Sequence, residues 1–118
     1  MIIDMSILRA MVRDVGIEMF PGIRDVYVQE ATETIERIQK ALSSGDYQTL
    51  ARDIHTQKSV LGTYGAAAAL EQALSLDRKC KAGVAIGEME AEIRQFIGTL
   101  LETRDAVSGL TAEDLKEF

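Results

Sequence analysis

Apolar residues recur at spacings of three and four along most of this chain, which is the period of an amphipathic α-helix. The clearest run is Val28, Ala31, Ile35, Ile38 and Leu42, and Ser43-Ser44-Gly45 follows it as a stop signal. Similar runs predict a short helix from Ile3 to Val15, ended by Gly16, and long helices over residues 47–61, 66–81 and 86–107. No stretch alternates with a period of two, so the pattern predicts an all-α protein.

Short connections join the four long predicted helices. Asp46 is expected to cap the helix that follows it, and Gly62 and Gly65 bracket a tight turn before the next one. Connections of a few residues favour antiparallel neighbours. We therefore expect one domain over residues 1–118, made of an up-down antiparallel four-helix bundle at 20–108, a short N-terminal capping helix within 1–18, and a polar tail at 111–118 that adds one turn.

Charge and composition narrow the possible partners. The 118 residues include 19 acidic and 13 basic side chains, and the resulting net charge of -6 repels nucleic acid and anionic lipid. No segment reaches the roughly 18 consecutive apolar residues of a membrane span, and the N-terminus does not resemble a signal peptide. Cys80 is the sole cysteine, so a reduced compartment is expected, with the cytoplasm as the simplest choice.

His55 is the only histidine and falls near the middle of the helix predicted over 47–61. Lys58 follows it by three residues, so an imidazole and an ammonium share one patch of helix surface. We expect the ring to face solvent, because the apolar stripe of that helix occupies another side. A neutral imidazole is a nucleophile that can carry a phosphoryl group, and positive charge beside it would stabilise that group. The neighbours expected to contact a partner protein are Ala51, Arg52, Ser59 and Gly62.

The surroundings of His55 resemble the histidine-containing phosphotransfer (HPt) domain family between about Phe20 and Gly83. The family typically reads Gly-Asp and then a helix that leads to the phosphorylated histidine, as in Gly45-Asp46-Tyr47-Gln48-Thr49-Leu50-Ala51-Arg52-Asp53-Ile54-His55 here. The turn Gly62-Thr63-Tyr64-Gly65 is similar to the corresponding turn of chemotaxis kinases. The resemblance implies that His55 is phosphorylated, that Lys58 is the cation near the phosphate, and that Asp77 stands where the family usually has glutamate.

A phosphorelay carrier is the function that this resemblance implies. The sequence has no Gly-rich phosphate loop and no cluster of acids able to hold magnesium beside a nucleotide, so we do not expect it to phosphorylate itself. The expected partner is a receiver domain of a response regulator or of a hybrid histidine kinase. That partner would bring the phospho-aspartate and the magnesium ion, and this chain is expected to need no cofactor or metal of its own.

Two other interpretations remain open. Gln57 stands where the family usually has a core leucine, and Ser59 replaces a glycine, as expected of a degenerate HPt-like module that binds a receiver without accepting phosphate. Val60 and Leu61 also replace smaller residues. The other interpretation is a metal-dependent bundle enzyme. A di-iron site needs Glu-x-x-His pairs, however, and Arg52 sits three residues before the only histidine.

Overall fold

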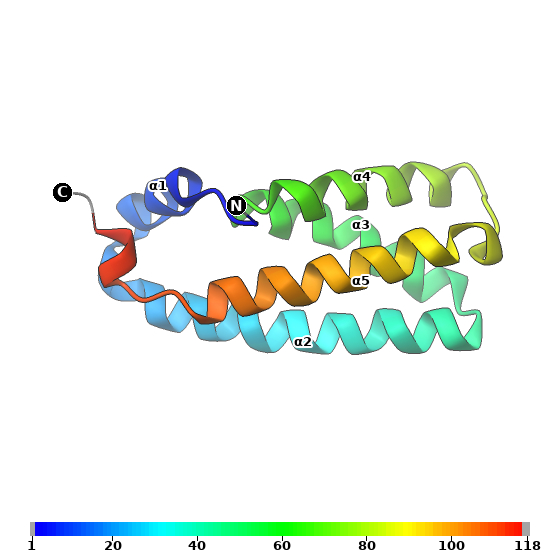
Figure 1. The fold of residues 1–118 in the computed structure, drawn as a ribbon, viewed down its shortest axis with the longest axis horizontal. Coiled ribbons are helices and arrows are strands. Elements are labelled where there is room, and N and C mark those ends of the chain that lie inside the picture. The colour runs from blue at the N-terminus through cyan, green and yellow to red at the C-terminus, as the bar shows by residue number, and fades with distance from the viewer. Residues whose placement is uncertain (1, 117–118) are drawn as a thin grey trace.

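The computed structural model describes residues 2–116, and within that range the chain is helical and forms no strand. Four long helices lie side by side in a molecule with principal extents of 48 × 21 × 20 Å (Figure 1). The all-α class predicted from the periodicity is confirmed. The elements in chain order are α1 (Met5–Val15), a 3-10 turn (Ile17–Met19), α2 (Phe20–Ser44), α3 (Tyr47–Thr63), α4 (Ala67–Lys81), α5 (Ile86–Ser108) and a second 3-10 turn (Glu113–Leu115).

The junction between α2 and α3 is built by local chemistry. Gly45 ends α2 in the left-handed conformation, with φ +72°, which costs glycine little because it has no Cβ. The Asp46 side chain then accepts a hydrogen bond of 3.1 Å from the backbone N–H of Thr49, which is unpaired in the first turn of α3. The predicted cap is confirmed, and it fixes where the helix that carries His55 begins.

The start of α2 lies well before the apolar run from which the helix was predicted. That run begins at Val28, whereas α2 begins at Phe20 and has Pro21 in its first turn. A proline there breaks no hydrogen bond, because the first N–H groups of a helix have no partner within it. Phe20 is completely buried and anchors this end of the helix.

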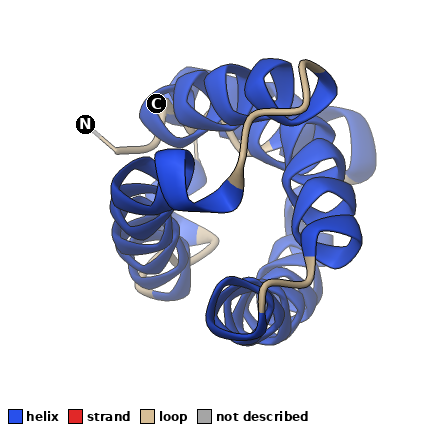
Figure 2. Cartoon of the chain, turned by 90° about the vertical axis from the view of Figure 1, so that its right-hand side faces the viewer, coloured by secondary structure: helices blue, strands red, loops and turns tan. Residues whose placement is uncertain are grey.

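The four long helices share one core. α2 and α4 each pack against both α3 and α5, and the end-on view shows the helices arranged around a common interior (Figure 2). Each fully buried leucine, isoleucine or phenylalanine contributes roughly 1.5–3 kcal/mol relative to an exposed one. Fully buried side chains come from every one of these helices: Ile38, Leu50, Ile54, Leu76, Ile93 and Phe96.

α1 packs across one end of the long helices. Leu8 and Val12 are buried, and the backbone N–H of Asp4 donates a 2.8 Å hydrogen bond to the carbonyl of Gly65 in the α3–α4 turn. The apolar stripe that predicts this helix is wider than the buried face and consists of Ile3, Ile7, Leu8, Met11 and Val15. Ile7 and Val15 belong to that stripe but are 41% and 48% exposed. The reason is that α1 lies at the end of the molecule and contacts the rest along a narrow strip.

After α5 the chain makes one further 3-10 turn at Glu113–Leu115. Leu115 in this turn is buried, which ties the segment to α1. Met1 and residues 117–118 of the predicted terminal segments lie outside the described residues. Among the helices described, none combines the length and apolar character needed to cross a membrane.

Candidate functional site

His55 projects from the outer side of α3. Leu50, Ile54 and Leu61 of the same helix are completely buried, which fixes the rotation of α3 and turns the histidine outward. The imidazole side chain is 58% exposed. A visiting protein can therefore reach the ring, as the helical pattern predicted.

Asp77 of α4 is the partner of this histidine. Its Oδ1 atom lies 3.1 Å from Nδ1 of His55, and its side chain is only 7% exposed. The small, completely buried residues Ala69 and Ala73 let α4 approach its neighbours closely, and Asp77 follows Ala73 by about one helical turn. The carboxylate is thus held beneath the ring by the packing of α4.

Two lysines share the other oxygen of the same carboxylate. Oδ2 of Asp77 accepts from Nζ of Lys58 at 2.8 Å and from Nζ of Lys81 at 2.9 Å. Burial alone would raise the pKa of Asp77, but hydrogen bonds from Lys58, Lys81 and His55 outweigh burial and hold that pKa well below its usual range. Asp77 is therefore ionised at any physiological pH.

The charge of Asp77 determines which imidazole nitrogen is free. A carboxylate can only accept a hydrogen bond, so Nδ1 of His55 carries the proton and donates it to Oδ1. In the neutral ring the lone pair available for reaction then resides on Nε2. The tautomer is assigned from this hydrogen bond. The site therefore presents an exposed imidazole ring whose Nε2 atom carries a free lone pair.

A shallow open depression of about 350 Å³ lies beside the ring. Of the residues expected at a partner surface, Ala51 and Arg52 line it, whereas Ser59 and Gly62 are exposed further along α3. Lys58 does not line it. Lys81 lines the depression but was not among the residues predicted for the site. Its position four residues after Asp77 on one helix could have indicated an ion pair between them. The full lining is Ala51, Arg52, His55, Asp77, Cys80 and Lys81.

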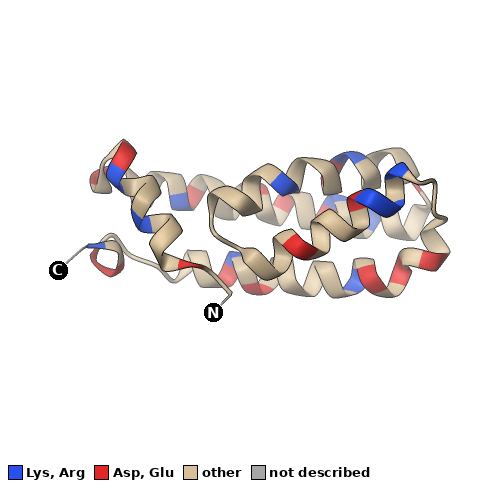
Figure 3. Ribbon diagram, turned by 90° about the horizontal axis from the view of Figure 1, so that it is seen from above, with Lys and Arg blue, Asp and Glu red and all other residues tan. Residues whose placement is uncertain are grey.

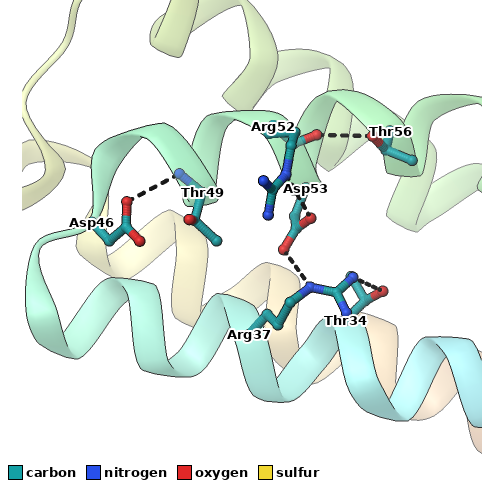
Figure 4. A network of polar contacts seen from close by, with 7 residues as sticks. All are labelled: Thr34, Arg37, Asp46, Thr49, Arg52, Asp53 and Thr56. Atoms are coloured by element: carbon teal, nitrogen blue, oxygen red, sulfur yellow. Dashed lines mark hydrogen bonds and ion pairs between the residues drawn. The ribbon is translucent and has the colours of Figure 1, made fainter.

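A second buried carboxylate lies on the α2 side of α3. The side chain of Asp53 is 7% exposed and accepts a hydrogen bond of 3.0 Å from Nε of Arg37 (Figure 4). Nη2 of the same arginine donates to the Thr34 hydroxyl at 3.0 Å. Arg52 approaches the same carboxylate more loosely, at 3.7 Å. This cluster joins α2 to α3 and leaves Arg52 exposed beside the depression.

Comparison with known families agrees with the geometry. Residues 22–110 match the family model of the Hpt domain. The match spans well over half of the chain, so the chain belongs to the Hpt domain family. Comparisons with curated proteins and with solved structures gave no significant match. Membership of this family assigns the chain to phosphotransfer in two-component signalling, where Hpt domains interact with receiver domains.

The departures from the family pattern fall in two different environments. Gln57 is buried, with only 6% of its surface exposed, as at the core position that the resemblance assigned to it. Ser59 is exposed on α3, one helical turn beyond His55. Gln57 therefore bears on packing, whereas Ser59 bears on what can approach the ring.

Proposed function

We propose that this protein is a phosphorelay carrier that accepts a phosphoryl group on Nε2 of His55 and passes it to a receiver domain. The donor is the phospho-aspartate of another receiver domain or a kinase. The observation that carries the proposal is the hydrogen bond between ionised Asp77 and Nδ1 of an exposed histidine. It gives the ring one protonated and one nucleophilic nitrogen, with the nucleophile on the open side.

The transfer step balances without any further reactant. A bond forms between Nε2 of His55 and phosphorus as the bond between phosphorus and the aspartyl oxygen of the receiver breaks, and both electrons of that bond leave with the receiver carboxylate. The ring keeps its Nδ1 proton and becomes positively charged. Asp77 faces that charge at 3.1 Å and stabilises it. Return of the phosphoryl group to a second receiver uses the same contacts in reverse.

Positive charge on this side of the interface comes from Lys58, Lys81 and Arg52. The first two share Asp77, and Arg52 lines the depression next to the ring. These cations reduce the electrostatic repulsion between the incoming phosphoryl group and the carboxylate of Asp77. In this proposal the receiver supplies the magnesium ion, and the carrier holds no cofactor of its own.

The proposed docking surface is the outward side of α3 together with the neighbouring edge of α4. Ala51, Arg52, Ser59 and Gly62 flank His55 along α3, and Leu74 on α4 adds an apolar side chain that is 40% exposed. Such a surface, small and bordered by charge, suits the transient contact of a carrier that must release each partner.

We also propose that α2 to α5 form an up-down antiparallel bundle, that α1 caps this bundle, and that all five helices belong to one domain. Support comes from the ring of helix contacts and from the opposite directions of successive long helices in Figure 1. The lone cysteine favours a reduced compartment, so we place the carrier in the cytoplasm.

The direct test is incubation of the protein with a phosphorylated receiver domain. Wild type is expected to gain a label that is stable in base and labile in acid, and His55→Gln is expected to gain none. Equal labelling of His55→Gln would overturn the assignment. Receiver binding without label in the wild type would identify instead the receiver-binding module that accepts no phosphate.

A further inference from the structure

We propose that Lys81 is the residue that binds the phosphoryl group of phosphorylated His55, by leaving Asp77 for it. This inference rests on the proposed function. It assigns to α4 a role that the sequence pattern placed on Lys58 in α3. The observation behind it is that two ammonium groups compete for one oxygen of Asp77.

The charges around Asp77 do not balance before phosphorylation. One carboxylate carries a single negative charge, while Lys58 and Lys81 bring two positive charges to its Oδ2 atom at 2.8 and 2.9 Å. Two ammonium groups on the same oxygen repel each other, and this repulsion weakens the hold of Asp77 on both of them. A phosphoryl group adds about 1.5 to 2 negative charges and three acceptor oxygens. It therefore offers the surplus lysine a second anion.

Exposure and position distinguish the two lysines. The side chain of Lys58 is 24% exposed and does not line the depression beside His55, whereas that of Lys81 is 63% exposed and does. A lysine held partly under neighbouring atoms must break packing contacts in order to move. Lys81 needs only to rotate its flexible stem across an open surface. The geometry therefore leaves Lys58 on Asp77 and frees Lys81.

The other charged groups near the ring do not take this role. Arg52 lines the depression, but its side chain is directed towards Asp53 on the α2 side of α3, with Nε 3.7 Å from that carboxylate (Figure 4). Lys79 also belongs to the basic last turn of α4 (Figure 3), and it pairs with Glu92 of α5 at 2.5 Å. Before phosphorylation the hydrogen bond to Asp77 raises the pKa of Lys81, so this side chain is a charged ammonium group.

The test is a phosphorus NMR titration of protein phosphorylated by phosphoramidate, a small donor that needs no receiver domain. In this reaction the phosphorus–nitrogen bond of phosphoramidate breaks, ammonia leaves and the bond to Nε2 forms. A cation beside the phosphoryl group lowers the pKa of that group, because it favours the dianion. In Lys81→Met we expect the phosphoryl pKa to lie roughly 0.5 above the wild-type value, a change of about threefold in the acid constant.

Three variants serve as matched comparisons. Lys58→Met is expected to raise the phosphoryl pKa less than Lys81→Met does. Lys79→Met is expected to leave the phosphoryl pKa at the wild-type value. Lys81→Arg keeps a cation at this position and is also expected to keep the wild-type value. A shift in Lys58→Met at least as large as in Lys81→Met, or no shift in Lys81→Met, would overturn the inference and leave the carrier function standing. Absence of any phosphohistidine signal from folded wild type would overturn the proposed function itself.

Discussion

Nδ1 of His55 lies 3.1 Å from Oδ1 of Asp77, although the two residues are 22 positions apart and belong to different helices. The contact sets the tautomer of the ring, so the packing of α4 determines which nitrogen of His55 carries the proton. A change that shifts or neutralises Asp77 should therefore act on His55 without touching it.

Asp77→Asn is expected to slow phosphoryl transfer to His55 by at least about tenfold, because the neutral amide neither stabilises the charged ring nor enforces one tautomer. The measurement is the initial rate of labelling from a phosphorylated receiver. Asp53→Asn is the matched control, because Asp53 is equally buried and also ion-paired but faces α2. If the initial rate of labelling falls by the same factor in both variants, general destabilisation of α3 explains the effect, and the role proposed for Asp77 is contradicted.

The ionisation of Asp77 should also appear in acid unfolding. Its pKa lies below the ordinary value of 3.8 in the folded protein, so the unfolded chain takes up a proton at this position first as the pH falls. The stabilising contribution is complete above about pH 5 and declines as the pH drops through about 4 towards the folded pKa. Thermal unfolding of wild type and Asp77→Asn between pH 2.5 and 6 measures it. The stability difference between them should shrink towards low pH, and a constant difference would contradict the prediction.

Arg37→Met should destabilise the fold by about 1–3 kcal/mol, because it removes the close partner of the buried Asp53 carboxylate. Arg52→Met should cost less than about 1 kcal/mol, since Arg52 is exposed and 3.7 Å from the same group. Urea denaturation of the two variants gives both values. Equal losses would mean that Arg52 holds Asp53 as firmly as Arg37 does.

Gly65→Ala should destabilise the protein by roughly 1–3 kcal/mol. Gly65 has φ +64°, and a Cβ atom there would come within 2.9 Å of the Asp4 carbonyl oxygen, which would displace α1. Gly62→Ala is the comparison, because a Cβ at that position meets nothing within 4 Å. Its exposed place in α3 predicts a gain of up to about 1 kcal/mol. Thermal unfolding distinguishes the two, and a loss of stability in both would contradict this account of the turn.

Ser59→Trp tests the docking surface separately from the chemistry. The larger side chain should reduce transfer from a phosphorylated receiver by about tenfold or more through a clash with the partner. Phosphorylation by phosphoramidate should stay within about twofold of wild type. Gln95→Trp places the same side chain at an exposed position of α5 and should change neither rate. Loss of both reactions in Ser59→Trp would point to damage at His55 instead of at a docking surface.

Local sequence signals were sufficient for the helices and for the exposure of the histidine. The stripe through Leu50 and Ile54 sets the rotation of α3, and the Asp46 cap sets its start. These signals succeed because helix periodicity and capping act over a few residues. In α1 the same periodicity predicted more burial than the structure has, since Ile7 and Val15 are exposed. Periodicity shows which side of a helix is apolar, but it does not show how much of that side another element covers.

Helical periodicity and residue spacing were enough to predict a helical protein whose one histidine points outward from a helix, with Lys58 beside it on the same surface. The contact of Asp77 with Nδ1 of His55, the sharing of that carboxylate by Lys58 and Lys81, and the pairing of Arg37 with Asp53 emerged from the folded structure. Each contact between two helices depends on how those helices are rotated and placed against each other. Packing of the whole core sets that relation, and no short stretch of sequence contains it.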